Sequence, residues 1–146
     1  MTRRGSLTDA RFALIACALC FSPAIAAAEM VAVVAAKSGV TTLSRNQVMD
    51  VFLGKAIRFP DGTIAIPIDQ AEGSAERNAF YSEFGGKSPA QIKAHWSKVI
   101  FTGRGRPPRE VLNGVEVKKF IARNPGAIGY IDSTLVDGDV RVISER

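Results

Sequence analysis

The sequence contains few of the residues that enzymes and metal sites need. Two cysteines and one histidine occur among 146 residues. Cys17 and Cys20 both precede residue 29, so the remainder of the chain has no thiol. This absence excludes a disulfide scaffold, a thiolate metal site and a cysteine nucleophile from residues 29–146. His95 has no acidic residue four positions before or after it, and we predict a partly exposed helical side chain there.

Other sequence patterns of catalysis and metal binding are also missing. There is no Gly-x-Ser-x-Gly nucleophile elbow and no P-loop. Asp132, Asp137 and Asp139 lie around a turn, but they do not have the spacing of a calcium-binding loop. The sequence therefore predicts a protein that is not an enzyme and that uses no metal ion or cofactor.

Long apolar runs are absent too. Residues 12–21 form an apolar run that is shorter than the roughly 20 residues a membrane-spanning helix requires. Arginines precede this run, and residues 26–28 supply the small side chains that signal peptidase needs. We predict that residues 1–28 are a signal peptide cleaved before Glu29, and that the protein is periplasmic. Residues 14–17 resemble a lipoprotein cleavage box, but little apolar sequence precedes them, so lipidation is a minor alternative.

The excess of positive charge is small. The chain has 19 basic and 14 acidic residues, a net charge of +5. Residues 1–28 hold three arginines and one aspartate, which leaves a net charge of +3 for the 118 residues that follow. That charge favours anionic partners weakly and is far from the composition of a nucleic-acid-binding protein. A chain of this length is sufficient for one domain, residues 29–146.

The apolar patterns predict strands that alternate with helices. We expect strands at 30–36, 64–68, 127–131 and 140–143, and helices at 44–53, 74–84, 88–100 and 110–123. Pro67 indicates an edge position or a strand end, and Trp96 and Phe101 are expected in the core. Alternation of this kind is typical of an α/β fold with a mostly parallel sheet flanked by helices.

One turn has the features of an anion site. Gly73 and Ser74 follow the second expected strand and open a helix, and ligands bind where parallel strands end and helices begin. The Ser74 hydroxyl and the first N–H groups of the helix would then face one point. The alternative is that Ser74 only caps the helix, with Glu72 and Glu76 complementing the helix dipole. Spacing alone leaves both interpretations open.

Two other loops carry donors for an anion. Ser38 follows the first expected strand, beside Lys37, and a solvated turn is the alternative there. Arg104 and Arg106 lie in a glycine- and proline-rich loop, where guanidinium groups could bind phosphate or carboxylate oxygens. The alternatives for this loop are a flexible surface segment or a docking patch for an acidic partner.

Three stretches of the sequence resemble a known family. LSRNQVMDVFLGK (43–55), FPDGTIAIPIDQAEGSAERNAF (59–80) and NPGAIGYID (124–132) are similar to the phosphate-binding proteins of bacterial ABC phosphate importers. The resemblance implies one lobe of a two-lobed type II periplasmic-binding-protein fold. It also implies phosphate or a related oxyanion as ligand and an ABC permease as partner.

The resemblance is partial, because full-length members of this family are more than twice as long and have a first lobe with its own anion-binding loop. We therefore expect a single-lobe domain. Two alternatives follow from the missing lobe. A homodimer could rebuild the cleft from two lobes, or the domain could be a periplasmic interaction or sensor-accessory module that has lost the ligand. The second alternative implies a sensor or outer-membrane protein as its partner.

The resemblance also suggests roles for individual residues. The family typically reads Arg-x-Asp-Gly-Ser-Gly-Thr where residues 70–76 read QAEGSAE. Gly73 and Ser74 match, and Glu72 replaces the aspartate that accepts from a protonated phosphate oxygen. Gln70 replaces the arginine, a loss we expect to cost about 1.5–3 kcal/mol of binding free energy. The candidate ligand-binding residues are Gln70, Glu72, Gly73, Ser74, Arg77, Ser38, Arg104 and Arg106.

Overall fold

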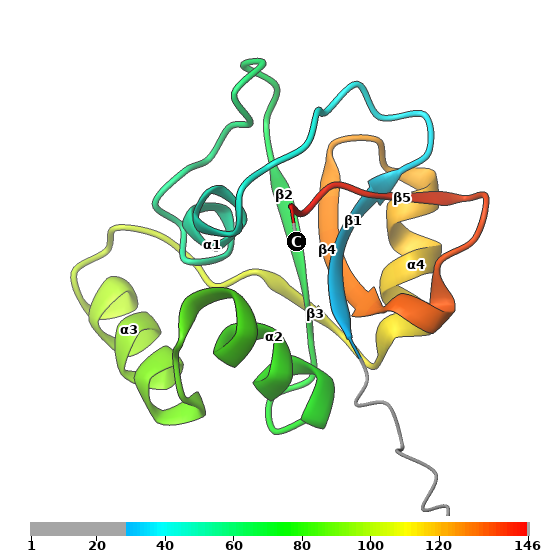
Figure 1. Cartoon of the computed structure of the whole chain (residues 1–146). Coiled ribbons are helices and arrows are strands. Elements are labelled where there is room, and N and C mark those ends of the chain that lie inside the picture. Colours follow the sequence, from blue (N-terminus) through cyan, green and yellow to red (C-terminus); the bar gives the residue numbers. More distant parts are fainter. Residues whose placement is uncertain (1–28, 146) are drawn as a thin grey trace, which may run out of the picture.

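The computed structural model describes residues 29–145 (Figure 1). The predicted signal peptide, residues 1–28, lies outside the described residues. The elements in chain order are β1 (Met30–Ala35), α1 (Arg45–Phe52), β2 (Ile66–Gln70), α2 (Ala75–Gly85), α3 (Pro89–Phe101), β3 (Arg109–Val111), α4 (Gly114–Arg123), β4 (Ala127–Asp132), η1 (Ser133–Leu135) and β5 (Val140–Val142). No helix in residues 29–145 is long and apolar enough to span a bilayer.

The strands form one five-stranded sheet in the order β3-β2-β4-β1-β5. β2 is parallel to both β3 and β4, whereas β1 is antiparallel to both β4 and β5. Four of the five strands therefore run in one direction and β1 alone is reversed. The expectation of an α/β fold with a mostly parallel sheet is confirmed. One consequence matters for function: β2, β3 and β4 all end at the same edge of the sheet.

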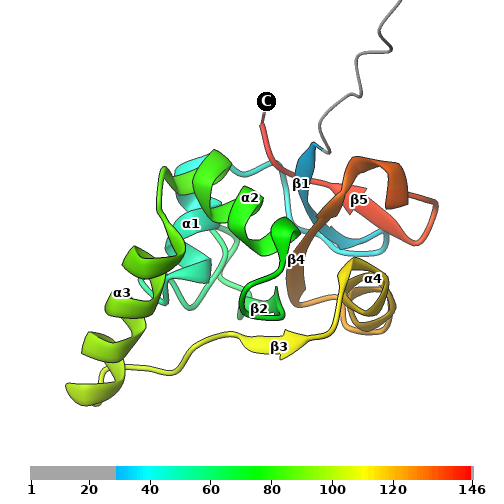
Figure 2. The same ribbon diagram turned by 90° about the horizontal axis from the view of Figure 1, so that it is seen from below.

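Helices cover both faces of this sheet (Figure 2). α1 and α2 pack on one face with α3 beside them, and α4 packs on the other face. The first interface is aromatic: the ring of Phe80 stacks on Tyr130 with centroids 3.9 Å apart, and Phe52 meets Phe80 edge-on. The second interface is aliphatic and includes Ile68, Val117 and Ile121. Burial on both sides explains why β1 and β4 are continuous apolar runs in the sequence.

Three expectations differ from the observed elements. The helix expected at 110–123 begins only at Gly114, where the Asn113 side chain accepts from the Glu116 N–H, and Arg109–Val111 forms the edge strand β3. A three-residue strand is too short to produce a periodic pattern. The second strand lies two residues later than expected. Phe101 is 93% exposed at the end of α3, not in the core, whereas Trp96 is buried as expected.

The position of Pro67 agrees with its chemistry. It lies near the start of β2, where only β4 pairs with the strand, because pairing with β3 begins at Ile68. Proline has no N–H to donate, so it fits the part of the strand that has an open side. The prediction of a strand end is confirmed.

Candidate functional site

The turn before α2 lies where β2 ends. Gly73 has a φ of 84°, a left-handed conformation that glycine adopts without strain. Ser74 is the N-cap residue, and its hydroxyl accepts from the Arg77 N–H at 3.2 Å. Within the described residues, the N–H groups of Ala75 and Glu76 have no acceptor. The cap predicted for Ser74 is thus present, and it leaves two backbone donors free at the helix start.

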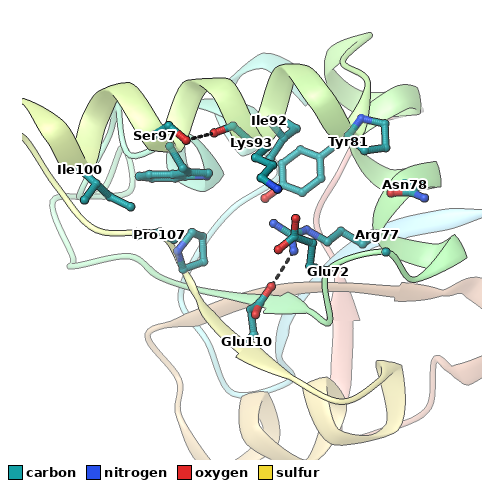
Figure 3. Close-up of a pocket in the computed structure, with 14 residues that line it drawn as sticks. Glu72, Arg77, Asn78, Tyr81, Ile92, Lys93, Ser97, Ile100, Pro107 and Glu110 are labelled. Carbon is teal, nitrogen blue, oxygen red and sulfur yellow. Dashed lines mark hydrogen bonds and ion pairs between the residues drawn. The ribbon is translucent and has the colours of Figure 1, made fainter.

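Arg77 is held between two carboxylates. Its Nε lies 3.5 Å from Oδ2 of Asp69. Its NH1 lies 2.6 Å from Oε1 of Glu110, a pair that Figure 3 shows. Burial is the largest single influence and lowers the pKa of Arg77, but Asp69 and the other acidic groups around it, Glu110 among them, together raise this pKa above its ordinary value. The positive charge that the sequence placed beside the turn is therefore neutralised by acidic neighbours in β2 and β3.

Asp69 is a buried carboxylate with a full set of donors. Its side chain is 1% exposed, and it accepts from the hydroxyl of Tyr81 at 2.7 Å, from the hydroxyl of Tyr130 and from the Gln70 N–H at 2.8 Å. Burial, followed by the Asp69 charge, raises the pKa of both Tyr81 and Tyr130. Both phenols are therefore protonated and donate to the carboxylate at physiological pH. This network anchors α2 and β4 to β2.

Gln70 points away from the helix start. Successive side chains of a strand face opposite sides of the sheet, so Gln70 lies on the α4 face while Asp69 faces α2. Its Nε2 donates to the carbonyl of Tyr130 at 3.0 Å, and a methyl group added at Gly114 would lie 3.7 Å from that nitrogen. Gln70 is 1% exposed, and Oε1 has no hydrogen-bond partner among the described residues. Gln70 is therefore part of the interior on the α4 side.

The structure does not bring Ser38 to this turn. Because β1 is antiparallel to β4, with Met30 opposite Asp132 and Val34 opposite Ile128, Ser38 follows the other edge of the sheet. A strand rise of about 3.3 Å per residue puts that edge roughly 16 Å from the end of β4. The Ser38 hydroxyl accepts from the Val40 N–H at 3.2 Å. The expectation of Ser38 as a donor to the same ligand assumed a parallel β1, and it is wrong.

The arginine loop is exposed. Arg104 and Arg106 follow α3, both side chains face solvent, and neither makes an ion pair with a described residue.

His95 in α3 is half-buried, with Nε2 2.9 Å from the carbonyl oxygen of Leu53. The nitrogen that faces this carbonyl donates, which is a structural role. The partly exposed helical histidine predicted from the sequence is confirmed.

A groove of about 390 Å³ opens beside the turn (Figure 3). Its walls are α2, α3 and the segment 107–110, and Glu72, Gly73 and Arg77 form its end next to the α2 start. Trp96 and Ile92 from α3 contribute apolar surface. Sequence patterns did not predict this groove, because its third wall comes from a loop and an edge strand with no periodic signal. The apolar stripe of α3 was the only indication of it.

Comparison with solved structures identifies the fold. No family model and no curated protein matches the sequence. A structure from Clostridium perfringens, described as a phosphate ABC transporter substrate-binding protein with bound phosphate, matches with a TM-score of 0.64 and 19% identity. The match covers 80% of this chain and 44% of that one.

Two further structures agree. An ABC-type phosphate transport receptor from Vibrio cholerae gives a TM-score of 0.62 and 20% identity over 80% of this chain and 45% of its own. PstS from Borrelia burgdorferi gives a TM-score of 0.57 and 11% identity, and the match covers 80% of this chain and 47% of that one. The chain therefore has the fold of one part of phosphate ABC transporter substrate-binding proteins, and it spans less than half the length of these structures.

Proposed function

We propose that this domain is a non-catalytic, exported binding protein that binds a small oxyanion such as phosphate at the start of α2. The observation that carries the proposal is the pair of free N–H groups on Ala75 and Glu76, where β2 ends. Unpaired N–H groups and the positive end of the helix dipole attract an anion there. Its fold matches that of a solved protein with bound phosphate, which supports the same ligand class.

The surrounding charges define which oxyanion fits. Glu72 and Glu76 are exposed beside the turn, and Arg77 is held by Asp69 and Glu110. A fully deprotonated anion is repelled by these carboxylates. An anion that retains a proton can donate it to Glu72, because an ionised carboxylate only accepts hydrogen bonds. Monohydrogen and dihydrogen phosphate carry such a proton at neutral pH, and sulfate does not.

Isothermal titration calorimetry of residues 29–146 with phosphate and with sulfate tests this proposal. We expect a saturable heat with phosphate and a clearly weaker one with sulfate. Absence of any heat up to millimolar phosphate, with the protein folded by circular dichroism, would contradict oxyanion binding. Equal affinity for the two anions would contradict the role of Glu72.

A second function is favoured by the loss of positive charge at the turn. Arg77 is paired, and the family's arginine is a buried glutamine, Gln70, on the opposite face. The domain could thus be a periplasmic interaction or sensor-accessory module, with Arg104 and Arg106 as the docking surface for an acidic partner. Replacing both arginines with alanine discriminates the two functions. An adaptor would lose its partner and keep its response to phosphate, whereas a ligand in contact with these arginines would bind more weakly.

Two possible partners follow from the exposure of the α2 start, where Ala75 and Glu76 face solvent. An importer permease is the partner expected if the domain delivers its ligand, and a second copy of the chain is the partner expected if two lobes enclose it. Light scattering of residues 29–146 with and without phosphate tests the dimer. A monomer under both conditions would contradict it.

A further inference from the structure

The groove between α2, α3 and residues 107–110 adjoins the turn at Glu72 and Gly73, but Ala75 and Glu76, which carry the free N–H groups, do not line it. Its volume of about 390 Å³ lies within the range of small-molecule sites. Much of its wall is apolar, including Tyr81, Ile92 and Pro107. The groove therefore provides an apolar surface of the size of a small ligand, next to the turn but formed largely by α3 and the β3 segment.

Trp96 is a polar group in this wall whose hydrogen bond is not satisfied. It is 6% exposed, it lines the groove, and its Nε1–H has no acceptor among the described residues. The opposite edge of the indole packs on Gly54, since a methyl group added there would lie 3.0 Å from Cη2. The nitrogen is itself buried, so Trp96 contributes its ring, and not a hydrogen bond, to the wall of the groove. Its fluorescence therefore reports on what the groove binds.

The charges that line the groove are of both signs. Arg77 and Glu110 satisfy each other at 2.6 Å. Lys93 and Glu72 make no ion pair within 4 Å of a described residue, and Figure 3 shows them pointing from α3 and from the turn into the same space. One free cation and one free anion over an apolar floor are complementary to a ligand that carries both charges on an apolar body.

We propose that this groove binds a free apolar α-amino acid. The carboxylate of the ligand would accept from Lys93, and its ammonium group would donate to Glu72. Its side chain would lie against Ile92, Tyr81 and Pro107. This site does not depend on oxyanion binding, and a protein that binds no phosphate would still have it.

The test uses the intrinsic fluorescence of Trp96, because it is the single tryptophan of the chain. Residues 29–146 are titrated with L-leucine, with 4-methylpentanoate, which lacks the ammonium group, and with 3-methylbutylamine, which lacks the carboxylate. We expect a saturable change with L-leucine and binding about tenfold weaker, or more, for each analogue, since each loses one charge-assisted contact. No saturable change with L-leucine would overturn the proposal. Equal or tighter binding of 4-methylpentanoate would overturn it in favour of a simple amphipathic anion.

Variants distinguish binding in the groove from a general effect of surface charge. Lys93→Met and Glu72→Gln should each weaken L-leucine binding about tenfold. Lys98→Met and Glu83→Gln remove the same charges from exposed positions of α3 and α2 that do not line the groove, and they should leave the affinity unchanged. An equal effect of the control variants would contradict the site. Glu72 borders both sites, so the control is Ala75→Pro, which deletes a free N–H group of the α2 start at a residue that does not line the groove. It should leave the affinity for L-leucine within about twofold, and a loss of L-leucine binding equal to the loss of phosphate binding would contradict a distinct groove site.

Discussion

At the residue scale, the stability of this domain depends on how the buried Asp69 is satisfied. Its oxygens accept from two phenols and one backbone N–H, and Arg77 approaches from α2. A buried carboxylate without these donors would be strongly destabilising. The sequence shows an aspartate at the end of an apolar run, but its partners are 12 and 61 residues away. No local pattern could predict that network.

Removal of one donor should measurably destabilise the fold. Tyr81→Phe keeps the aromatic packing against Phe80 and deletes the hydroxyl that donates to Asp69. We expect a loss of about 1–3 kcal/mol in the free energy of unfolding, measured by urea denaturation. Ser97→Ala is the matched control, because it removes an exposed hydroxyl and should change the free energy by less than about 0.5 kcal/mol. A Tyr81→Phe variant as stable as the control would contradict the role of the network.

The same phenols predict how stability depends on pH. Burial and the Asp69 charge raise the pKa of Tyr81 and Tyr130 in the folded state above the ordinary value of 10.0. Above about pH 10 the unfolded chain releases these protons and the folded chain retains them, so the free energy of unfolding falls as the pH rises. Below that pH, this contribution is fully present.

Absorbance at 295 nm can measure this effect directly, because the chain has only two tyrosines and both belong to the network. We expect no tyrosinate signal in the folded protein on raising the pH, and a rise that coincides with unfolding monitored by circular dichroism. A tyrosinate signal that develops near pH 10 in folded protein would show that the phenols are not held by Asp69.

At the scale of elements, the close approach of α4 to the sheet depends on Gly129 in β4. A methyl group there would lie 2.6 Å from Cδ1 of Ile121 and nearer still to Cγ1 of Val117. Gly129→Ala should therefore cost about 1–3 kcal/mol of unfolding free energy in a urea titration, because the helix must shift. Gly138→Ala is the control, since nothing lies within 4 Å of the added methyl group. Equal stability of the two variants would show that α4 has room at Gly129.

The elements themselves follow largely from the sequence. Helices α1 and α3 begin where the sequence predicted, after Ser44 and Ser88, and each start is a capping box. Such a start can be predicted because the residues that form it are only three positions apart. The continuous apolar runs of β1 and β4 were also predicted correctly. What could not be predicted were the short edge strand β3 and the reversed direction of β1, since pairing partners are distant in sequence. That reversal is why Ser38 lies at the opposite edge of the sheet from the proposed oxyanion site.

At the scale of the whole molecule, the proposed oxyanion site is exposed to solvent within residues 29–145. Ala75 and Glu76 are exposed, and the chain spans less than half the length of the solved structures it matches. An open site does not exclude water, and hydrogen bonds in water contribute less than those in a closed site. We therefore expect modest oxyanion affinity, with tighter binding only when a partner or a second copy covers the edge.

Phosphate titration of Ala75→Pro shows directly whether the start of α2 holds the anion. Ala75 is the first residue of α2, a position where proline is tolerated. Proline has no backbone N–H, so the substitution deletes one of the two free donors. The chain already begins α3 with Ser88-Pro89, and Ser74 (φ −67°, ψ 146°) has nearly the same backbone angles as Ser88 (φ −77°, ψ 161°). The fold should therefore be retained.

Ala75→Ser keeps the N–H and is the matched control. In calorimetric titrations, we expect Ala75→Pro to bind phosphate about tenfold or more weakly than the unchanged protein, and Ala75→Ser to bind with unchanged affinity. If Ala75→Pro is folded by circular dichroism and binds phosphate as tightly as Ala75→Ser, the anion is not held by the start of α2.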